Sequence, residues 1–216
     1  MTRLWGAAVL ALSLGTACSA PKPTLVDFSE TARDYRAQDY KTVYDRWTRH
    51  DWALHEVDAA LEVWATFKSW DFREAYIERY ATVYSMSDAD RRVLRQAQLE
   101  SFHSGFEFHM TTQSANYKWN DLDKKDSAWR VTLLDGTGRE LVPETLRINK
   151  LPDAYEREFF PAKTPFTKTF ALRFALPSAD AASGAPAVDF KGPKTGSITL
   201  RIASPLGRVE LVWRSS

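Results

Sequence analysis

The spacing of apolar residues changes once along this chain, and that change constrains the fold more than any other feature. From about Thr31 to Ser101 the sequence contains neither glycine nor proline, and its apolar residues recur every three or four positions. After Gly105 apolar and polar residues alternate instead. The sequence therefore predicts helices first and strands second.

The segment 29–102 is predicted to hold three or four amphipathic helices. Thr31, Asp71 and Ser87 each open a four-residue pattern typical of a capping box, in which a side-chain oxygen accepts from a free backbone N–H. The apolar stripes are Tyr40, Val43, Tyr44 and Trp47; then Leu54, Val57, Leu61 and Trp64; then Phe72, Tyr76, Tyr80, Val83 and Tyr84.

The segment 103–216 is predicted to form an immunoglobulin-like antiparallel β-sandwich of about six or seven short strands. Turn residues at 135–138 and 204–207 separate some of them, and 178–193, rich in Ala, Ser, Gly and Pro, is predicted to be a long flexible loop. The clearest strand candidates are 106–110, 129–133, 166–176, 198–202 and 209–213. The expected fold class is α+β, a helical region followed by a sandwich.

The first 17 residues are predicted to be a cleavable signal peptide. Arg3 precedes an apolar run from Leu4 to Leu14, whose length matches the roughly 7–15 residues of a signal peptide and not the ~20 of a membrane-spanning helix. Small residues follow this run.

Those small residues end in Gly15-Thr16-Ala17-Cys18, which resembles the lipobox of bacterial lipoproteins. The resemblance implies that Cys18 carries the lipid, palmitate included, and becomes the mature N-terminus. It also implies that Ser19 favours the outer membrane over the inner. Because Gly15 stands where the lipobox usually has Leu, cleavage after Ala20 by ordinary signal peptidase is the alternative.

Two further features agree with a lipid anchor in the cell envelope. Cys18 is the only cysteine of the chain, so lipidation would remove a thiol that an oxidising periplasm makes a liability. Prolines at 21 and 23 predict an extended tether over 18–28.

The charge balance excludes a typical nucleic-acid partner. Lys and Arg total 29 against 28 for Asp and Glu, and Arg3 would leave with the signal peptide.

The histidines and the densest acidic segment do not predict a metal site or another cofactor. His50 and His55 are five residues apart, a poor spacing for two ligands on one helix. His103 and His109 fall on the predicted outer face of the first strand, without further ligands nearby in the sequence. The acidic segment 120–126 contains two lysines and lacks the glycine of a calcium loop, so we expect a solvated loop.

No catalytic residue is predicted, and an enzyme is the less expected class. The chain has no Gly-x-Ser-x-Gly or His-Glu-x-x-His motif, although a triad assembled from distant residues stays open.

Tyr117 and Trp119 are the candidate ligand-binding residues, because they lie in a polar stretch between predicted strands. We expect a lipid-anchored, non-enzymatic envelope protein that binds a protein partner or assists an assembly. The first alternative is binding of cell-wall or surface glycan through these aromatic residues. The second is an envelope hydrolase of unrecognised type.

Overall fold

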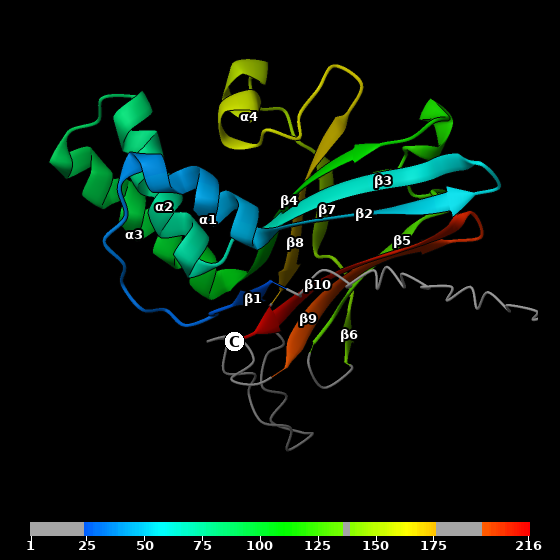
Figure 1. The fold of residues 1–216 in the computed structure, drawn as a ribbon, viewed down its shortest axis with the longest axis horizontal. Helices are drawn as coiled ribbons and strands as arrows, with labels where there is room; N and C mark the ends of the chain where they lie inside the picture. Colours follow the sequence, from blue (N-terminus) through cyan, green and yellow to red (C-terminus); the bar gives the residue numbers. More distant parts are fainter. Residues whose placement is uncertain (1–23, 136–138, 176–195) are drawn as a thin grey trace, which may run out of the picture.

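The computed structural model describes residues 24–135, 139–175 and 196–216, and it contains two five-stranded sheets (Figure 1). The expected helical region followed by an immunoglobulin-like sandwich is wrong, because strands from the first half of the chain take part in both sheets.

The helices are α1 (Tyr40–Trp47), α2 (Trp70–Val83), α3 (Asp88–Ser104) and α4 (Asp153–Phe159), with short 3-10 helices η1 (Ala37–Asp39) and η2 (Tyr117–Trp119). The strands are β1 (Leu25–Val26), β2 (Thr48–His55), β3 (Asp58–Phe67), β4 (Gly105–Gln113), β5 (Arg130–Leu134), β6 (Glu140–Leu141), β7 (Thr145–Ile148), β8 (Lys168–Ala175), β9 (Ser197–Ser204) and β10 (Gly207–Ser215).

Each sheet combines strands that are distant in the sequence. Sheet 1 has the order β1-β10-β9-β5-β6, and sheet 2 has the order β2-β3-β4-β8-β7. β1 runs parallel to β10, and the other pairs are antiparallel. The boundary expected at 102/103 falls in α3, between β3 and β4, which pair with each other in sheet 2. β1 lies within the segment expected to be a tether.

The hairpin of β2 and β3 replaces the second expected helix. Its apolar residues Leu54, Val57, Leu61 and Trp64 mimic a helical stripe, but Leu54 and Val57 are exposed in the structure. The turn between the strands places Glu56 in the left-handed region, with φ of 55°. Hairpin turns of this kind usually carry Gly, Asn or Asp. A glutamate there leaves no turn signal in the sequence.

One hydrophobic core joins the inner faces of the two sheets. Trp213 of β10 packs against Phe67 and Phe108 of sheet 2, with ring centroids 6.2 and 5.3 Å apart. Its Nε1 donates to the carbonyl of Trp47 at 2.8 Å. The sheets come together along β2 and β10, where Arg49 Nε donates to the carbonyl of Val212 at 2.9 Å.

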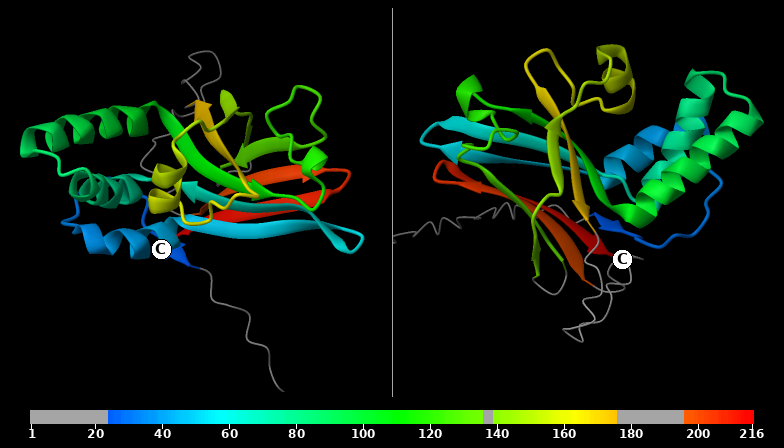
Figure 2. Two further views of the ribbon diagram at one scale, coloured as in Figure 1. Left: turned by 90° about the horizontal axis from the view of Figure 1, so that it is seen from above. Right: turned by 180° about the vertical axis from the view of Figure 1, so that it is seen from behind.

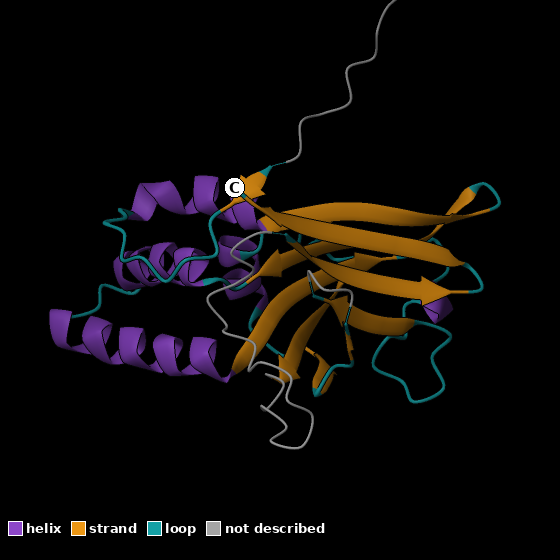
Figure 3. Cartoon of the chain, turned by 90° about the horizontal axis from the view of Figure 1, so that it is seen from below, coloured by secondary structure: helices purple, strands orange, loops and turns teal. Residues whose placement is uncertain are grey.

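The helices α1, α2 and α3 gather at one end of the sheets (Figure 3). The short helix α4 follows later in the chain (Figures 1 and 2), and its Phe159 packs on Tyr40 of α1 and Tyr76 of α2. The stripe of α1 is buried as its spacing predicts. Ser87 caps α3 as expected, and its hydroxyl accepts from the Asp90 N–H at 3.1 Å. α2 begins earlier than expected, because Ser69 and not Asp71 is its cap, and Thr31 begins no helix.

The strand pattern of the second half is largely confirmed by β4, β5, β8, β9 and β10. Phe166 is an exception, because it precedes β8 and is exposed. The expected signal peptide, Cys18 and the expected loop 178–193 lie outside the described residues.

Candidate functional site

A pocket of about 440 Å³ lies on the outer face of sheet 2, between the sheet and residues of α2, α3 and α4. We call it the outer pocket. Its sheet side comes from β4, β7 and β8, and Lys68 lines it from the segment that joins β3 to α2. It therefore draws on six elements, and on the segments that join some of them, from distant parts of the sequence.

Strand alternation and register place the polar side chains on this face. Phe106 and Phe108 of β4 point into the core, so Glu107 and His109 point the other way. His109 pairs across the sheet with Ala171, which pairs with Arg147 of β7.

Arginine and lysine surround one carboxylate in the pocket, that of Glu107. Arg73 Nη2 donates to Glu107 at 2.9 Å, and Arg173 Nη1 lies 3.3 Å from the same group. Lys68 Nζ lies 3.9 Å from Glu107 Oε2. Burial raises the pKa of Glu107, but the charges of Arg73 and Lys68 outweigh it and hold the pKa below its ordinary value. Glu107 is therefore ionised at neutral pH.

Lys68 is the pocket cation whose charge is most sensitive to pH. Burial of its ammonium group, with the nearby charge of Arg73, lowers the pKa of Lys68 to about 8, although Glu107 acts in the opposite direction. At neutral pH the ammonium form predominates.

His109 is a buried, neutral histidine with one unsatisfied nitrogen. Its ring stacks on Phe160 with centroids 3.5 Å apart, and Asn149 Nδ2 lies 3.4 Å from its Nδ1. Burial, followed by the charges of Lys68 and Lys163, holds the pKa of His109 well below its ordinary value. Because an amide nitrogen can only donate, Nδ1 accepts and the proton sits on Nε2. Within the described part of the chain Nε2 has no hydrogen-bond partner.

Two tyrosines form an aromatic wall of the pocket. The hydroxyls of Tyr76 on α2 and Tyr155 on α4 are 2.6 Å apart, so they hold the two helices together. Burial, followed by the neighbouring Tyr155, raises the pKa of Tyr76. Both hydroxyls therefore stay protonated and can only exchange hydrogen bonds.

This arrangement is suited to binding. Nucleophilic catalysis needs a hydroxyl or thiol within hydrogen-bond reach of a base. No hydroxyl in the described ranges forms a hydrogen bond with His109 Nε2. The pocket offers cations, amides and rings instead.

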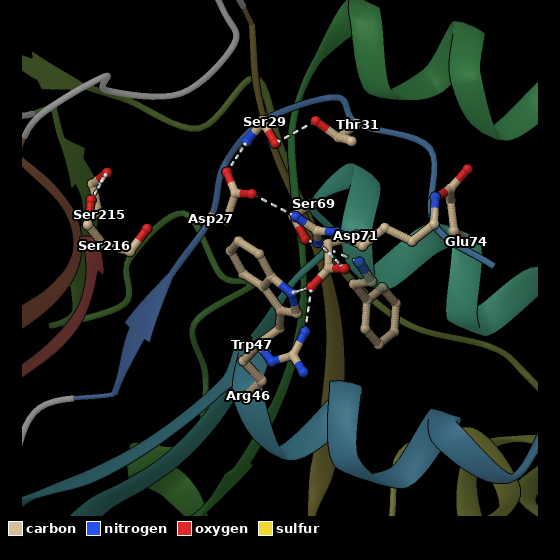
Figure 4. A network of polar contacts seen from close by, with 12 residues as sticks. Asp27, Ser29, Thr31, Arg46, Trp47, Ser69, Asp71, Glu74, Ser215 and Ser216 are labelled. Carbon is tan, nitrogen blue, oxygen red and sulfur yellow. Dashed lines mark hydrogen bonds and ion pairs between the residues drawn. The ribbon is translucent and has the colours of Figure 1, made fainter. Parts of the chain in front are cut away.

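A second charged cluster lies beside the outer pocket, around the buried carboxylate of Asp71 (Figure 4). Tyr35 donates to it at 2.5 Å, Trp47 Nε1 at 2.7 Å and Arg46 at 3.0 Å, and Arg33 forms an ion pair with it. Burial raises the pKa of Asp71, but the hydrogen bonds from Tyr35, Trp47 and Arg33 outweigh it and lower the pKa. This cluster fastens residues 33–35 and the end of α1 to the start of α2.

The residues singled out from the sequence lie elsewhere. Tyr117 and Trp119 are on η2 and do not line the outer pocket. Tyr117 is 76% exposed, whereas Trp119 packs against the core and its carbonyl accepts from Trp129 Nε1 at 2.7 Å. Cys18 lies outside the described residues.

The remaining candidates are engaged in local contacts. His50 pairs with Glu62 at 2.8 Å, and His103, at the end of α3, pairs with Glu30 at 3.0 Å. Asn120 is buried against Thr112 of β4. Over the residues that the structure describes, no group of three His, Cys, Asp or Glu side chains could hold a metal ion.

Sequence reasoning missed Lys68, Arg147 and Arg173. The alternation around Phe174 does place Arg173 opposite the core, but nothing in the sequence indicates that helices cover that face of the sheet. β7 is too short and too polar to be recognised as a strand.

No family model matches this chain, and no curated protein matches it. One solved structure is similar: a novel protein of unknown function from Burkholderia pseudomallei K96243, with a TM-score of 0.40 and 14% identity. The match covers 82% of this chain and 89% of that one. None of the helices in the described part is long and apolar enough to cross a membrane.

Proposed function

We propose that this protein is a lipid-anchored envelope protein that acts without catalysis, by binding a small molecule in the outer pocket. The observation that carries the binding role is a pocket lined by polar groups that the described protein leaves incompletely satisfied. Its volume, about 440 Å³, falls in the range of roughly 300–1,000 Å³ typical of small-molecule sites.

The unsatisfied nitrogen of His109 supports a ligand more directly. A buried polar group without a hydrogen bond costs free energy, and such groups are rare in native proteins. A bound molecule or an ordered water can supply the missing acceptor. The neighbouring Lys68 and Asn149 make the pocket polar enough to hold such a molecule.

A screen that assumes no particular ligand class tests the binding role. The melting temperature of the full-length protein in mild detergent is measured with each member of a library of soluble metabolites. The same measurements are made on Ala171→Trp, whose larger side chain fills the floor of the pocket. We expect compounds that raise the melting temperature of the wild type alone, with Ala171→Ser as the control that keeps the pocket open. If no compound discriminates between the wild type and Ala171→Trp, the outer pocket is not a ligand site.

The anchor rests on the lipobox-like sequence before Cys18 and on the absence of other cysteines. Several acyl chains hold a protein firmly, since each buried methylene contributes ~0.8 kcal/mol. Cys18→Ala should move the protein from the membrane fraction, the outer membrane in particular, to the soluble periplasmic fraction. Unchanged membrane residence would contradict lipidation.

A second candidate function is binding of an envelope protein, favoured by exposed apolar side chains at the turn between β2 and β3. Leu54 and Val57 are 59% and 92% exposed there, and His55 of the same turn contacts Trp119 of η2, two residues from the exposed Tyr117. Crosslinking in intact cells should capture a partner with the wild type and lose it with Val57→Asp. A glycan ligand would be lost with Tyr117→Ala instead.

A further inference from the structure

The charges that line the outer pocket are unbalanced. Lys68, Arg147 and Arg173 line it with positive charge, and Glu107 is the single carboxylate among its described lining residues. The pocket therefore carries a net positive charge, and such a charge in a concave site attracts an anionic ligand.

Glu107 supplies one negative charge for three cations, because Arg73 binds it as well as Arg173 and Lys68. The Arg73 side chain is only 2% exposed and binds Glu107 at 2.9 Å, Gln98 at 2.6 Å and the carbonyl of Lys68 at 3.0 Å. Ser101 also donates to Glu107, at 2.8 Å. The carboxylate is therefore used mainly to hold Arg73 in place beneath the pocket.

Arg173 has a second acid, but Arg147 has none. Arg173 Nε donates to Glu144 at 2.9 Å, Nη1 to Glu107 at 3.3 Å and Nη2 to the carbonyl of Ser104 at 3.0 Å. A ligand can therefore use only the remaining N–H groups of Arg173. Arg147 lies on the neighbouring strand, paired with Ala171, and its exposed side chain makes neither an ion pair nor a hydrogen bond with any residue that the structure describes. Its guanidinium is free to bind a ligand at the mouth of the pocket.

We propose that the outer pocket binds the oxyanion group of a small organic molecule, a carboxylate or a phosphate, between Arg147, Arg173 and Lys68. A guanidinium presents N–H groups in a planar fork that matches both groups, and an ammonium adds a point charge. Tyr76, Tyr155 and Leu151 line the same pocket and can contact the uncharged part of the molecule. This assignment rests on the proposed binding function and names its ligand class.

The test is a calorimetric titration of the full-length protein in mild detergent with benzoate, inorganic phosphate and uncharged benzamide. Benzoate or phosphate should bind saturably with a dissociation constant of roughly millimolar order, and benzamide should bind much more weakly. A preference for benzoate indicates a carboxylate ligand, and a preference for phosphate indicates a phosphate ester.

Charge-removing variants separate the pocket from nonspecific attraction. Arg147→Gln should weaken the anion about tenfold, the effect of one lost charge-assisted contact. Arg208→Gln is the matched control, because Arg208 is an exposed arginine of β10 in the other sheet, and it should leave the affinity unchanged.

Three results would overturn the assignment: no saturable binding of either anion up to about 50 mM, equal binding of benzamide and benzoate, or equal weakening by Arg147→Gln and Arg208→Gln. The metabolite screen distinguishes this failure from failure of the proposed function. If neutral compounds stabilise the wild type and not Ala171→Trp, the pocket binds small molecules that are not anions. If neither experiment finds a ligand, both proposals fail.

Discussion

Two clusters of arginines and carboxylates flank the start of α2, and they differ in how completely their polar groups are paired. Around Asp71, two arginines, a tyrosine and a tryptophan converge on one carboxylate, which accepts from all four. In the outer pocket, cations outnumber the carboxylate, and His109 Nε2 has no partner in the described chain. A closed cluster stabilises the fold, whereas an open one leaves groups for a ligand.

The helix itself separates the two clusters. Asp71 and Arg73 are two positions apart on α2, and two steps of ~100° place them on nearly opposite sides of the helix. Asp71 faces residues 33–35 and α1, while Arg73 faces Glu107 of sheet 2. One turn of helix therefore holds a structural contact on one side and supports the pocket on the other.

The largest effect is expected from opening the closed cluster. Asp71→Asn keeps the shape of the side chain but removes the negative charge that Arg33 and Arg46 share. Breaking a buried pair costs roughly 3–5 kcal/mol, and because both arginines are partly exposed we expect about 3 kcal/mol less free energy of unfolding. Urea denaturation at neutral pH measures this.

Asp45→Asn is the control for that experiment, because Asp45 pairs with Lys41 on the exposed surface of α1. It should leave the urea midpoint unchanged. A similar loss from both variants would mean that the Asp71 cluster is no more important to the fold than a surface pair.

The second prediction concerns the pH dependence of anion binding in the open cluster. Lys68 loses its proton as the pH rises through about 8, while Glu107 keeps its charge and His109 is already neutral. If the anion binds only the ammonium form, benzoate affinity should fall about tenfold between about pH 7 and about pH 9. Calorimetry at the two pH values measures this.

Lys68→Arg tests the assignment of that pH effect, since arginine stays charged throughout this range. Its benzoate affinity should be nearly constant from about pH 7 to about pH 9. An unchanged fall of affinity in Lys68→Arg would assign the titration to another group.

Comparing the clusters also shows how much of the structure the sequence could predict. The stripe from Tyr40 to Trp47 and the cap at Ser87 are local features, and both elements form as expected. The sequence did not predict the β2–β3 hairpin, because its turn uses Glu56 at positive φ and because Leu54 and Val57 follow helical spacing. The pairing of β3 with β4 is a long-range choice that periodicity cannot reveal.

The candidate site depends even more on long-range structure. Alternation along β4 correctly places His109 opposite the core, but its burial depends on Phe160, which stacks on it from beyond α4. Lys68 becomes a pocket residue through the position of α2 over the sheet. Neither residue belongs to a motif, so no local signal identifies them.

The third prediction compares an unsatisfied polar atom with a satisfied one. His109→Phe keeps a ring stacked on Phe160 and removes the nitrogen that lacks a partner, and it loses only the long 3.4 Å contact of Nδ1 with Asn149. The free energy of unfolding should therefore stay equal or rise by up to about 1 kcal/mol. Tyr35→Phe removes a hydroxyl that donates to Asp71 and should lower the free energy of unfolding by about 1–2 kcal/mol. Equal losses in urea denaturation would mean that His109 is satisfied.

The smallest effect on stability is expected from Arg147→Gln. Arg147 lies at the pocket mouth and makes no ion pair in the described chain, so its loss should change the free energy of unfolding by less than about 0.5 kcal/mol. Arg73→Gln removes a buried arginine from the same carboxylate cluster and should cost about 3 kcal/mol. If Arg147→Gln destabilises as Arg73→Gln does, the outer pocket is as closed as the Asp71 cluster. A variant that folds normally and loses only the anion would identify Arg147 as a binding residue.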